Sequence, residues 1–97
     1  MKRLILSLML IYFINFSFGQ TTLIPDTNFE QALIDLGFDT NGLNGNILDL
    51  DALAVTELYI DDPVNNTNLP NVNTAISDLT GLEGFTNLSI LHCKYNQ

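Results

Sequence analysis

Residues 76–97, "ISDLTGLEGFTNLSILHCKYNQ", carry the pattern that decides the predicted fold. Their apolar residues recur at every third position and finally after two: Ile76, Leu79, Leu82, Phe85, Leu88, Leu91 and Cys93. A free amphipathic helix mixes spacings of three and four, and a half-buried strand has a period of two, so neither element accounts for the pattern. A strict three followed by two suits a tight coil that directs one row of side chains inward before a short strand. The spacing predicts an α+β solenoid.

The end of this stretch fits a repeat consensus. Leu88-x-x-Leu91-x-Cys93-x-x-Asn96 satisfies the pattern L-x-x-L-x-L-x-x-N, with Cys93 as a small apolar residue in the third apolar place. Residues 76–97 therefore resemble one full leucine-rich repeat of the bacterial internalin type, whose period is about 22 residues. We interpret Asn96 as structural, because its side chain is expected to bond backbone groups of the turn and of the next coil.

The stretch before the repeat resembles the N-terminal cap of secreted leucine-rich-repeat proteins of the Bacteroidetes. Residues 24–45, "IPDTNFEQALIDLGFDTNGLNG", predict a helix that opens with a capping box of Thr27 and Glu30. Gly37 can take the left-handed position after the helix, so that Phe38 folds back onto Leu33. This helix has one apolar face and must cover other apolar residues.

A second short strand is expected between the helix and the repeat. Val55-x-x-Leu58-x-Ile60 echoes the strand part of the consensus, but Pro63 stands in the place of the asparagine. The resemblance implies a capping strand here, and a chain truncated where a second repeat would begin. The predicted segments are a signal peptide at 1–19, an N-terminal cap at 20–60, an Asn-rich loop at 61–75 and one leucine-rich repeat at 76–97.

The first nineteen residues and the charge indicate where the chain acts. "MKRLILSLMLIYFINFSFG" has a basic start, an apolar run and small residues at Ser17 and Gly19, which is typical of a secretory signal peptide. After cleavage, Lys94 alone stands against eleven acidic residues, a formal charge of 1 − 11 = −10. Such a surface repels nucleic acid and anionic lipid. We expect a secreted or cell-surface protein with no nucleic-acid partner and no membrane insertion after cleavage.

The resemblance implies recognition on the concave face of the repeat, where variable strand positions point outward. The predicted ligand-binding residues are Glu57, Tyr59, Ile90, His92, Lys94 and Tyr95. Tyr and His suit interfaces because each combines an apolar body with a polar tip. The alternative is that these are ordinary solvent-facing residues, since a specific interface needs about 20 residues a side.

The residues give little reason to expect catalysis. His92 and Cys93 are adjacent, but neighbours on a strand point to opposite faces, so they cannot form a thiol–imidazole dyad. A zinc site needs about four ligands, and these two have no companions. Asp49 and Asp51 could share a face, but no aromatic sugar platform accompanies them. We therefore expect a protein that is not an enzyme and holds no cofactor.

Calcium is the one metal for which the sequence offers ligands. In "DTNGLNGNILDLD", Asp39, Asn41, Asn44 and Asp51 follow the order of an EF-hand-like loop if one extra residue is allowed. Asn and Gly are also the commonest turn formers, so a plain turn is the competing interpretation.

The sequence thus predicts a non-enzymatic recognition module that binds a protein or glycan ligand. The alternatives are a calcium-stabilised structural module and a truncated fragment without independent function. If the chain is a fragment, its unpaired strand edge is expected to favour self-association.

Overall fold

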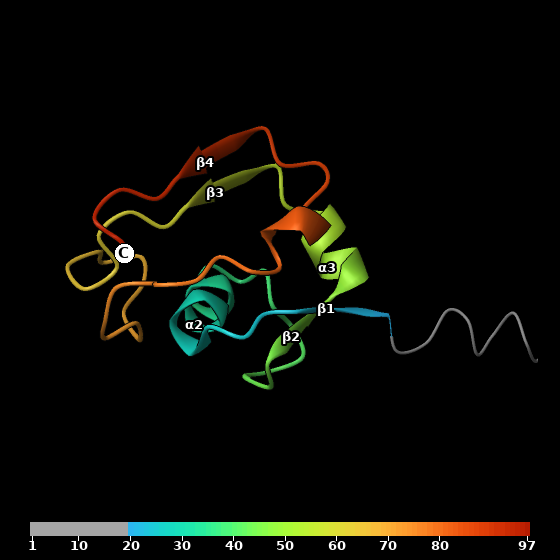
Figure 1. Ribbon diagram of the computed structural model, residues 1–97, viewed down its shortest axis with the longest axis horizontal. Helices are drawn as coiled ribbons and strands as arrows, with labels where there is room; N and C mark the ends of the chain where they lie inside the picture. Colours follow the sequence, from blue (N-terminus) through green and yellow to red (C-terminus); the bar gives the residue numbers. More distant parts are fainter. Residues whose placement is uncertain (1–19) are drawn as a thin grey trace, which may run out of the picture.

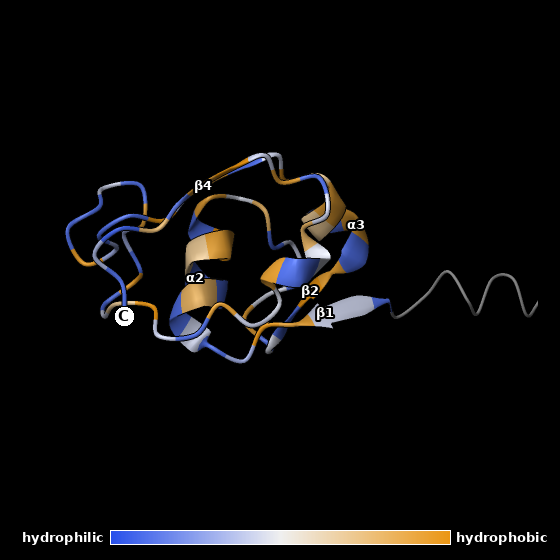
Figure 2. Cartoon of the chain, turned by 45° about the horizontal axis from the view of Figure 1, so that its top comes forward, coloured by the Kyte–Doolittle hydropathy of each residue, from blue (hydrophilic) through white to orange (hydrophobic). Residues whose placement is uncertain are grey.

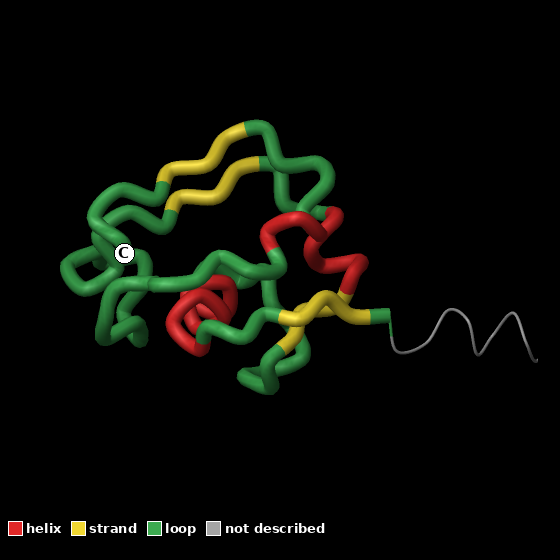
Figure 3. Tube along the Cα trace, in the orientation of Figure 1, coloured by secondary structure: helices red, strands yellow, loops and turns green. Residues whose placement is uncertain are grey.

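The structure, a computed structural model, describes residues 20–97, so the predicted signal peptide at 1–19 lies outside it. Short elements joined by long loops form an α+β fold (Figures 1 and 3). In chain order they are β1 (Thr21–Leu23), α2 (Thr27–Asp35), β2 (Asn46–Leu48), α3 (Asp49–Leu53), β3 (Glu57–Tyr59), the 3₁₀ helix η1 (Leu82–Gly84) and β4 (Ile90–His92).

The strands form two separate sheets of two strands each. β1 pairs with β2 in antiparallel fashion, with Thr22 opposite Ile47. β3 pairs with β4 in parallel, with Leu58 opposite Leu91. The β3–β4 pair runs along one side of the molecule, and α2 lies beneath it (Figures 1 and 2). A parallel pair of three-residue strands is weak alone, so its position depends on the core below it.

The solenoid prediction, with a capping strand followed by one leucine-rich repeat, is wrong. The described residues form a compact α+β fold with two two-stranded sheets and no stack of repeats. The periodic apolar residues of 76–97 also differ in burial. Ile76 and Phe85 are buried, whereas Leu91 is 36% exposed. A leucine-rich repeat buries its apolar row against neighbouring copies, and the described residues contain no such stack. The loop at 61–75 covers the apolar residues of 76–97 instead, and contributes the buried Leu69 and Val72.

Helix α2 forms where the sequence predicts a helix, but its cap differs. Asp26 is the N-cap, and its Oδ1 accepts the backbone N–H groups of Asn28 at 2.8 Å and Phe29 at 3.2 Å. Thr27 is the first helical residue, so the predicted capping box is wrong. Asp and Thr both suit the N-cap position. Asp26 takes it, and its carboxylate also accepts hydrogen bonds from Ser77 and Asp78. Glu30 consequently does not return to the cap and is buried instead.

The C-terminal end of α2 matches the prediction. Gly37 has φ 82°, in the left-handed region that favours glycine. The Gly37 N–H donates to the Ile34 carbonyl at 2.9 Å and the Phe38 N–H to the Leu33 carbonyl at 2.9 Å, a Schellman-type ending. Phe38 then packs against the core.

The core joins α2 to the last third of the chain. Phe29, Ala32 and Leu33 of α2 are fully buried. The ring of Phe29 stacks on that of Phe85 with centroids 6.3 Å apart and an interplanar angle of 28°. Figure 2 shows the hydrophobic colour on the central turns of α2. The other buried hydrophobic residues are Ile24, Ile47, Ala52, Val55, Leu58, Ile60, Leu69, Val72 and Ile76.

The antiparallel β1–β2 sheet and helix α3 were not predicted. The expected capping strand is present as Glu57–Tyr59, but the residues before it form β2 and α3. Asp49 and Asp51 lie in the first turn of α3, where acidic residues complement the helix dipole. Asp49 Oδ1 also accepts the Thr22 hydroxyl at 2.7 Å, which ties α3 to β1.

Asp26 connects the start of α2 to the segment that follows the loop. Its Oδ2 accepts the backbone N–H groups of Ser77 at 2.8 Å and Asp78 at 2.9 Å, and the Ser77 hydroxyl at 3.1 Å. Burial alone would raise the pKa of Asp26, but the backbone N–H groups outweigh it and the pKa is lowered. One carboxylate therefore fixes two segments that are about fifty residues apart.

None of the helices within residues 20–97 has the length and apolar character needed to cross a membrane.

Candidate functional site

The outer face of the β3–β4 pair gathers most of the predicted ligand-binding residues. On β3, the exposed Glu57 and Tyr59 flank the buried Leu58, as expected for strand alternation. On β4, His92 is exposed while Ile90 is half-buried. The parallel register places Tyr59 directly opposite His92, so the two strands contribute one continuous face.

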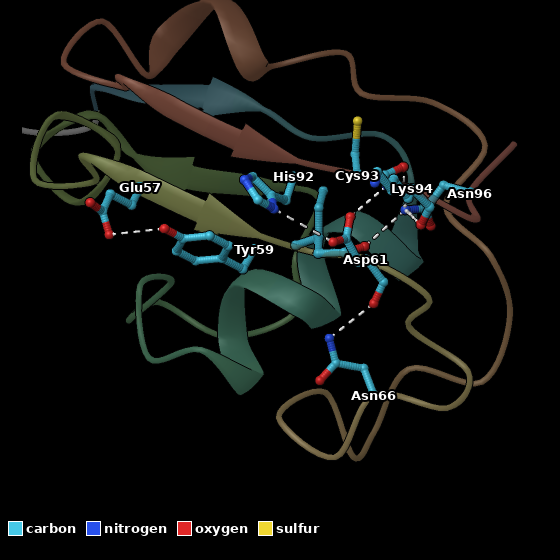
Figure 4. A network of polar contacts seen from close by, with 9 residues as sticks. Glu57, Tyr59, Asp61, Asn66, His92, Cys93, Lys94 and Asn96 are labelled. Carbon is cyan, nitrogen blue, oxygen red and sulfur yellow. Dashed lines mark hydrogen bonds and ion pairs between the residues drawn. The ribbon is translucent and has the colours of Figure 1, made fainter.

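Two rings form the centre of this face (Figure 4). The rings of Tyr59 and His92 meet edge to face, with centroids 4.9 Å apart and an interplanar angle of 65°. The Tyr59 hydroxyl donates to Glu57 Oε2 at 3.3 Å. Partial desolvation, together with the charge and hydrogen bond of Glu57, raises the pKa of Tyr59. A phenol is protonated at neutral pH in any case, so the Tyr59 hydroxyl is the donor in its bond with Glu57.

Asp61 closes one end of the same face and was missed by the sequence prediction. Its Oδ2 lies 3.7 Å from His92 Nδ1, and its Oδ1 accepts the Lys94 backbone N–H. Its carbonyl accepts the Asn66 side-chain amide at 2.9 Å (Figure 4). Asp61 follows Glu57 and Tyr59 at a spacing of two residues, so strand alternation could have placed it on the same face. The sequence analysis assigned it to the following loop instead.

Asn96 holds the chain that follows β4. Its Nδ2 donates to the Ile60 carbonyl at 2.8 Å and the Cys93 carbonyl at 3.1 Å, and its Oδ1 accepts the Ile76 N–H at 2.9 Å. The prediction that Asn96 bonds backbone groups of the turn is confirmed. Tyr95, which precedes it, has φ 60° and is 78% exposed, so it lies beyond the strand and outside the Tyr59–His92 contact.

A shallow groove follows the outer edge of β4. It has a volume of about 570 Å³ and is lined by Leu91, His92, Cys93 and Lys94. Among residues 20–97, β4 pairs with β3 alone, so this edge has no strand partner. The sheet thus offers two adjoining surfaces, a polar outer face and an open edge.

His92 and Cys93 are separated as strand alternation requires. The imidazole is exposed on the outer face, whereas Cys93 is half-buried and packs against the core. Figure 4 shows the two side chains pointing apart. This arrangement provides no thiol–imidazole pair.

Two of the four predicted calcium ligands, Asp51 and Asn44, use side-chain oxygens in hydrogen bonds of the loop itself. Asp51 Oδ2 accepts the Thr40 hydroxyl at 2.6 Å and its N–H at 3.1 Å, and the Asn44 side-chain oxygen accepts the Asn46 N–H at 3.3 Å. Within residues 20–97, no group of three or more His, Cys, Asp or Glu side chains is placed to hold a metal ion. Asp39 Oδ2 and Asn41 Oδ1 are buried without a hydrogen-bond partner, so calcium binding by this loop stays a prediction.

Comparisons of the chain with protein-family models, with curated proteins and with solved structures found no match. The resemblance to secreted leucine-rich-repeat proteins therefore stays a prediction from the residues alone.

Proposed function

We propose that the chain is a non-enzymatic, exported recognition module that binds a protein or glycan ligand on the outer face of the β3–β4 pair. The observation that carries the proposal is the contact between the exposed Tyr59 and His92, which belong to different strands and are flanked by Glu57 and Asp61. Aromatic and imidazole rings that are partly exposed and held by polar partners are typical of binding surfaces.

The side chains of this face are partly preorganised for binding. Tyr59 is held by Glu57, and His92 lies against both the Tyr59 ring and the Asp61 carboxylate. Fixing such side chains before the ligand arrives lowers the entropy lost on binding. The face combines one hydroxyl donor, a ring surface and two carboxylates, which suits a sugar or a basic protein segment.

The negative charge of the chain favours a basic protein segment over a sugar as the ligand. Residues 20–97 contain all eleven acidic residues and one lysine, Lys94. A basic protein segment is attracted by such a surface, and an acidic one is repelled. Where the ligand is a protein, we expect it to present lysine or arginine side chains towards Glu57 and Tyr59.

The test is a binding screen with Tyr59→Ala. Arrays of glycans and of basic peptides are probed with the wild-type chain, with Tyr59→Ala and with Leu50→Ala, whose residue is 79% exposed on α3. We expect a dissociation constant that rises about tenfold or more in Tyr59→Ala, because a central aromatic side chain carries a large share of the binding energy.

Leu50→Ala is expected to bind like the wild type, because its residue lies on α3 rather than on β3 or β4. A ligand whose binding survives Tyr59→Ala, and also His92→Ala, would place recognition elsewhere. Absence of binding to every glycan and basic peptide would contradict the proposed function.

A further inference from the structure

Two side-chain oxygens of the loop at 39–46 are buried without a hydrogen-bond donor. They are Asp39 Oδ2 and Asn41 Oδ1, and residues 20–97 contain no other buried side-chain nitrogen or oxygen atom without a partner. Asp39 as a whole is 6% exposed, so its carboxylate is removed from water. Leaving a buried acceptor without a partner destabilises a fold, and such groups are rare. Both oxygens therefore require a partner that the side chains of the loop do not supply.

The two oxygens belong to the same turn of the chain. Asp39 Oδ1 accepts the Asn41 N–H at 3.2 Å, which places the two side chains in one turn. Asn41 Nδ2 donates to Asn46 Oδ1 at 2.8 Å, and Asn44 Nδ2 donates to the Asn41 carbonyl at 3.2 Å. The donors of the loop are thus used within it, while one oxygen each of Asp39 and Asn41 still accepts nothing.

The charge around this loop is negative and has no basic partner. Besides Asp39, Glu30 of α2 is 1% exposed and its carboxylate bonds the loop backbone. Asp51 of α3 bonds the loop through its carboxylate as well. In the described part of the chain, His92 and Lys94 are the only basic side chains, and no ion pair reaches the loop. Since buried charges are normally paired or coordinate metals, the missing partner is expected to be a cation.

We propose that the loop at 39–46 binds a calcium ion through Asp39 Oδ2 and Asn41 Oδ1. Calcium takes oxygen ligands, combines carboxylate with amide oxygens and accepts irregular geometry. Magnesium demands a nearly ideal octahedron, and zinc and copper favour nitrogen and sulfur ligands, which this loop lacks. The site is separate from the recognition face, because both ligands lie outside β3 and β4.

The structure ranks the four ligands that the sequence suggests. Asp51 Oδ2 is held by the Thr40 hydroxyl at 2.6 Å, and Asn44 Oδ1 by the Asn46 N–H at 3.3 Å, so Asp39 and Asn41 are the two with unused oxygens. Because one of them is an asparagine, the site agrees with the absence of a metal-holding group of three His, Cys, Asp or Glu within residues 20–97.

The expected affinity is low. Calcium takes about six to eight ligands, so backbone carbonyls and water must complete the shell around these two side chains. Only one of the two carries a charge, and affinity rises with the charge of the ligands. We expect a dissociation constant of about 10⁻⁴ to 10⁻³ M, the range of extracellular modules.

A buried water molecule or a rotated Asn41 amide is the competing explanation. Either one would supply a hydrogen-bond donor to Asp39 Oδ2 without any metal. The variant Asn41→Asp separates the explanations, because it keeps an oxygen ligand, adds a negative charge and removes the amide donor. A calcium site should gain affinity from this change, whereas a turn that depends on the amide should not.

The test is calorimetric titration of the full chain with calcium chloride at about pH 7.5, where carboxylates are ionised. We expect the wild type to bind one calcium ion. Asp39→Asn should bind at least about tenfold more weakly, because it removes the charged ligand. Asn41→Asp should bind at least about threefold more tightly, because it adds one.

Asp62→Asn is the matched control, because it removes the same charge from a carboxylate that bonds the Asn65 amide, outside this loop. It should bind calcium like the wild type. An equal loss of affinity in Asp39→Asn and Asp62→Asn would mean diffuse attraction to the acidic surface and would overturn the proposal. No binding by the wild type at about 10 mM calcium, or weaker binding by Asn41→Asp, would overturn it in favour of a hydrogen-bonded turn.

A measurement on the wild type alone decides the question if Asp39→Asn does not fold. Calcium chloride is titrated into the full chain while its backbone amide resonances are followed by NMR. The proposal predicts the largest shifts at Asn41 and Gly45. Largest shifts at Glu57 and Asp61 instead would place the ion on the recognition face and refute the proposal.

Discussion

Phe29→Ala is expected to lower the free energy of unfolding by about 3–5 kcal/mol, the usual cost of removing a buried phenylalanine. Phe29 is fully buried and stacks on Phe85, so its loss leaves a cavity between α2 and the last third of the chain. Because a chain of this size has a small core, the loss should leave little or no folded protein at 25 °C. Denaturation in urea, followed by circular dichroism, measures the change.

Leu50→Ala is the control for the loss of a large apolar side chain. Leu50 is 79% exposed on α3, so its removal should change the free energy of unfolding by less than about 0.5 kcal/mol. If Phe29→Ala were as mild as Leu50→Ala, α2 would not share a core with the segment around Phe85.

Asp26→Ala is expected to cost about 2–3 kcal/mol, because it removes a helix cap together with the bonds to Ser77 and Asp78. Asp26→Asn separates the two contributions. Its side-chain oxygen can still cap α2, but its amide group cannot accept the N–H groups of the distant segment. The substitution should therefore cost about half as much. The two free energies are measured by urea denaturation at about pH 7.

The pH dependence provides a second check on Asp26. Its pKa is lowered from 3.8 in the folded state, so its contribution is present above pH 3.8 and is lost as the pH falls through the folded value. Wild type and Asp26→Ala should then approach each other in strongly acidic solution. A difference between them that does not change with pH would mean that the charge of Asp26 contributes nothing.

Local patterns in the sequence predicted the parts of the fold that depend on neighbouring residues. The helix and its left-handed end at Gly37 were predicted correctly, because both depend on residues within one or two turns. The outward direction of Glu57, Tyr59 and His92 also follows from strand alternation. The backbone bonds of Asn96 were predicted from the repeat consensus and are confirmed.

The errors arose where distant residues decide the local structure. Asp26 displaces Thr27 as the N-cap while its carboxylate also bonds Ser77 and Asp78, which no local pattern reveals. Glu30 has the spacing of a capping-box residue, yet its carboxylate binds the loop amides of Asn44 and Gly45. These bonds depend on the path of the whole chain.

The solenoid prediction failed for a related reason. Regularly spaced apolar residues predict which side chains are buried. They do not predict which other part of the chain packs against them. Here α2 and the loop at 61–75 cover the row through Phe29, Leu69 and Val72, where a solenoid would use further repeats.

The central claim is that residues 76–97 share one cooperative core with α2 and thereby hold the β3–β4 face in place. Native-state hydrogen exchange followed by NMR tests it most directly. The account predicts that the backbone amides of Ile60 and Ile90, which bond across the two strands, exchange with the same free energy as the interior amides of α2. Ile60 and Ile90 amides that exchange at nearly unfolded rates, while the α2 amides stay protected, would contradict it.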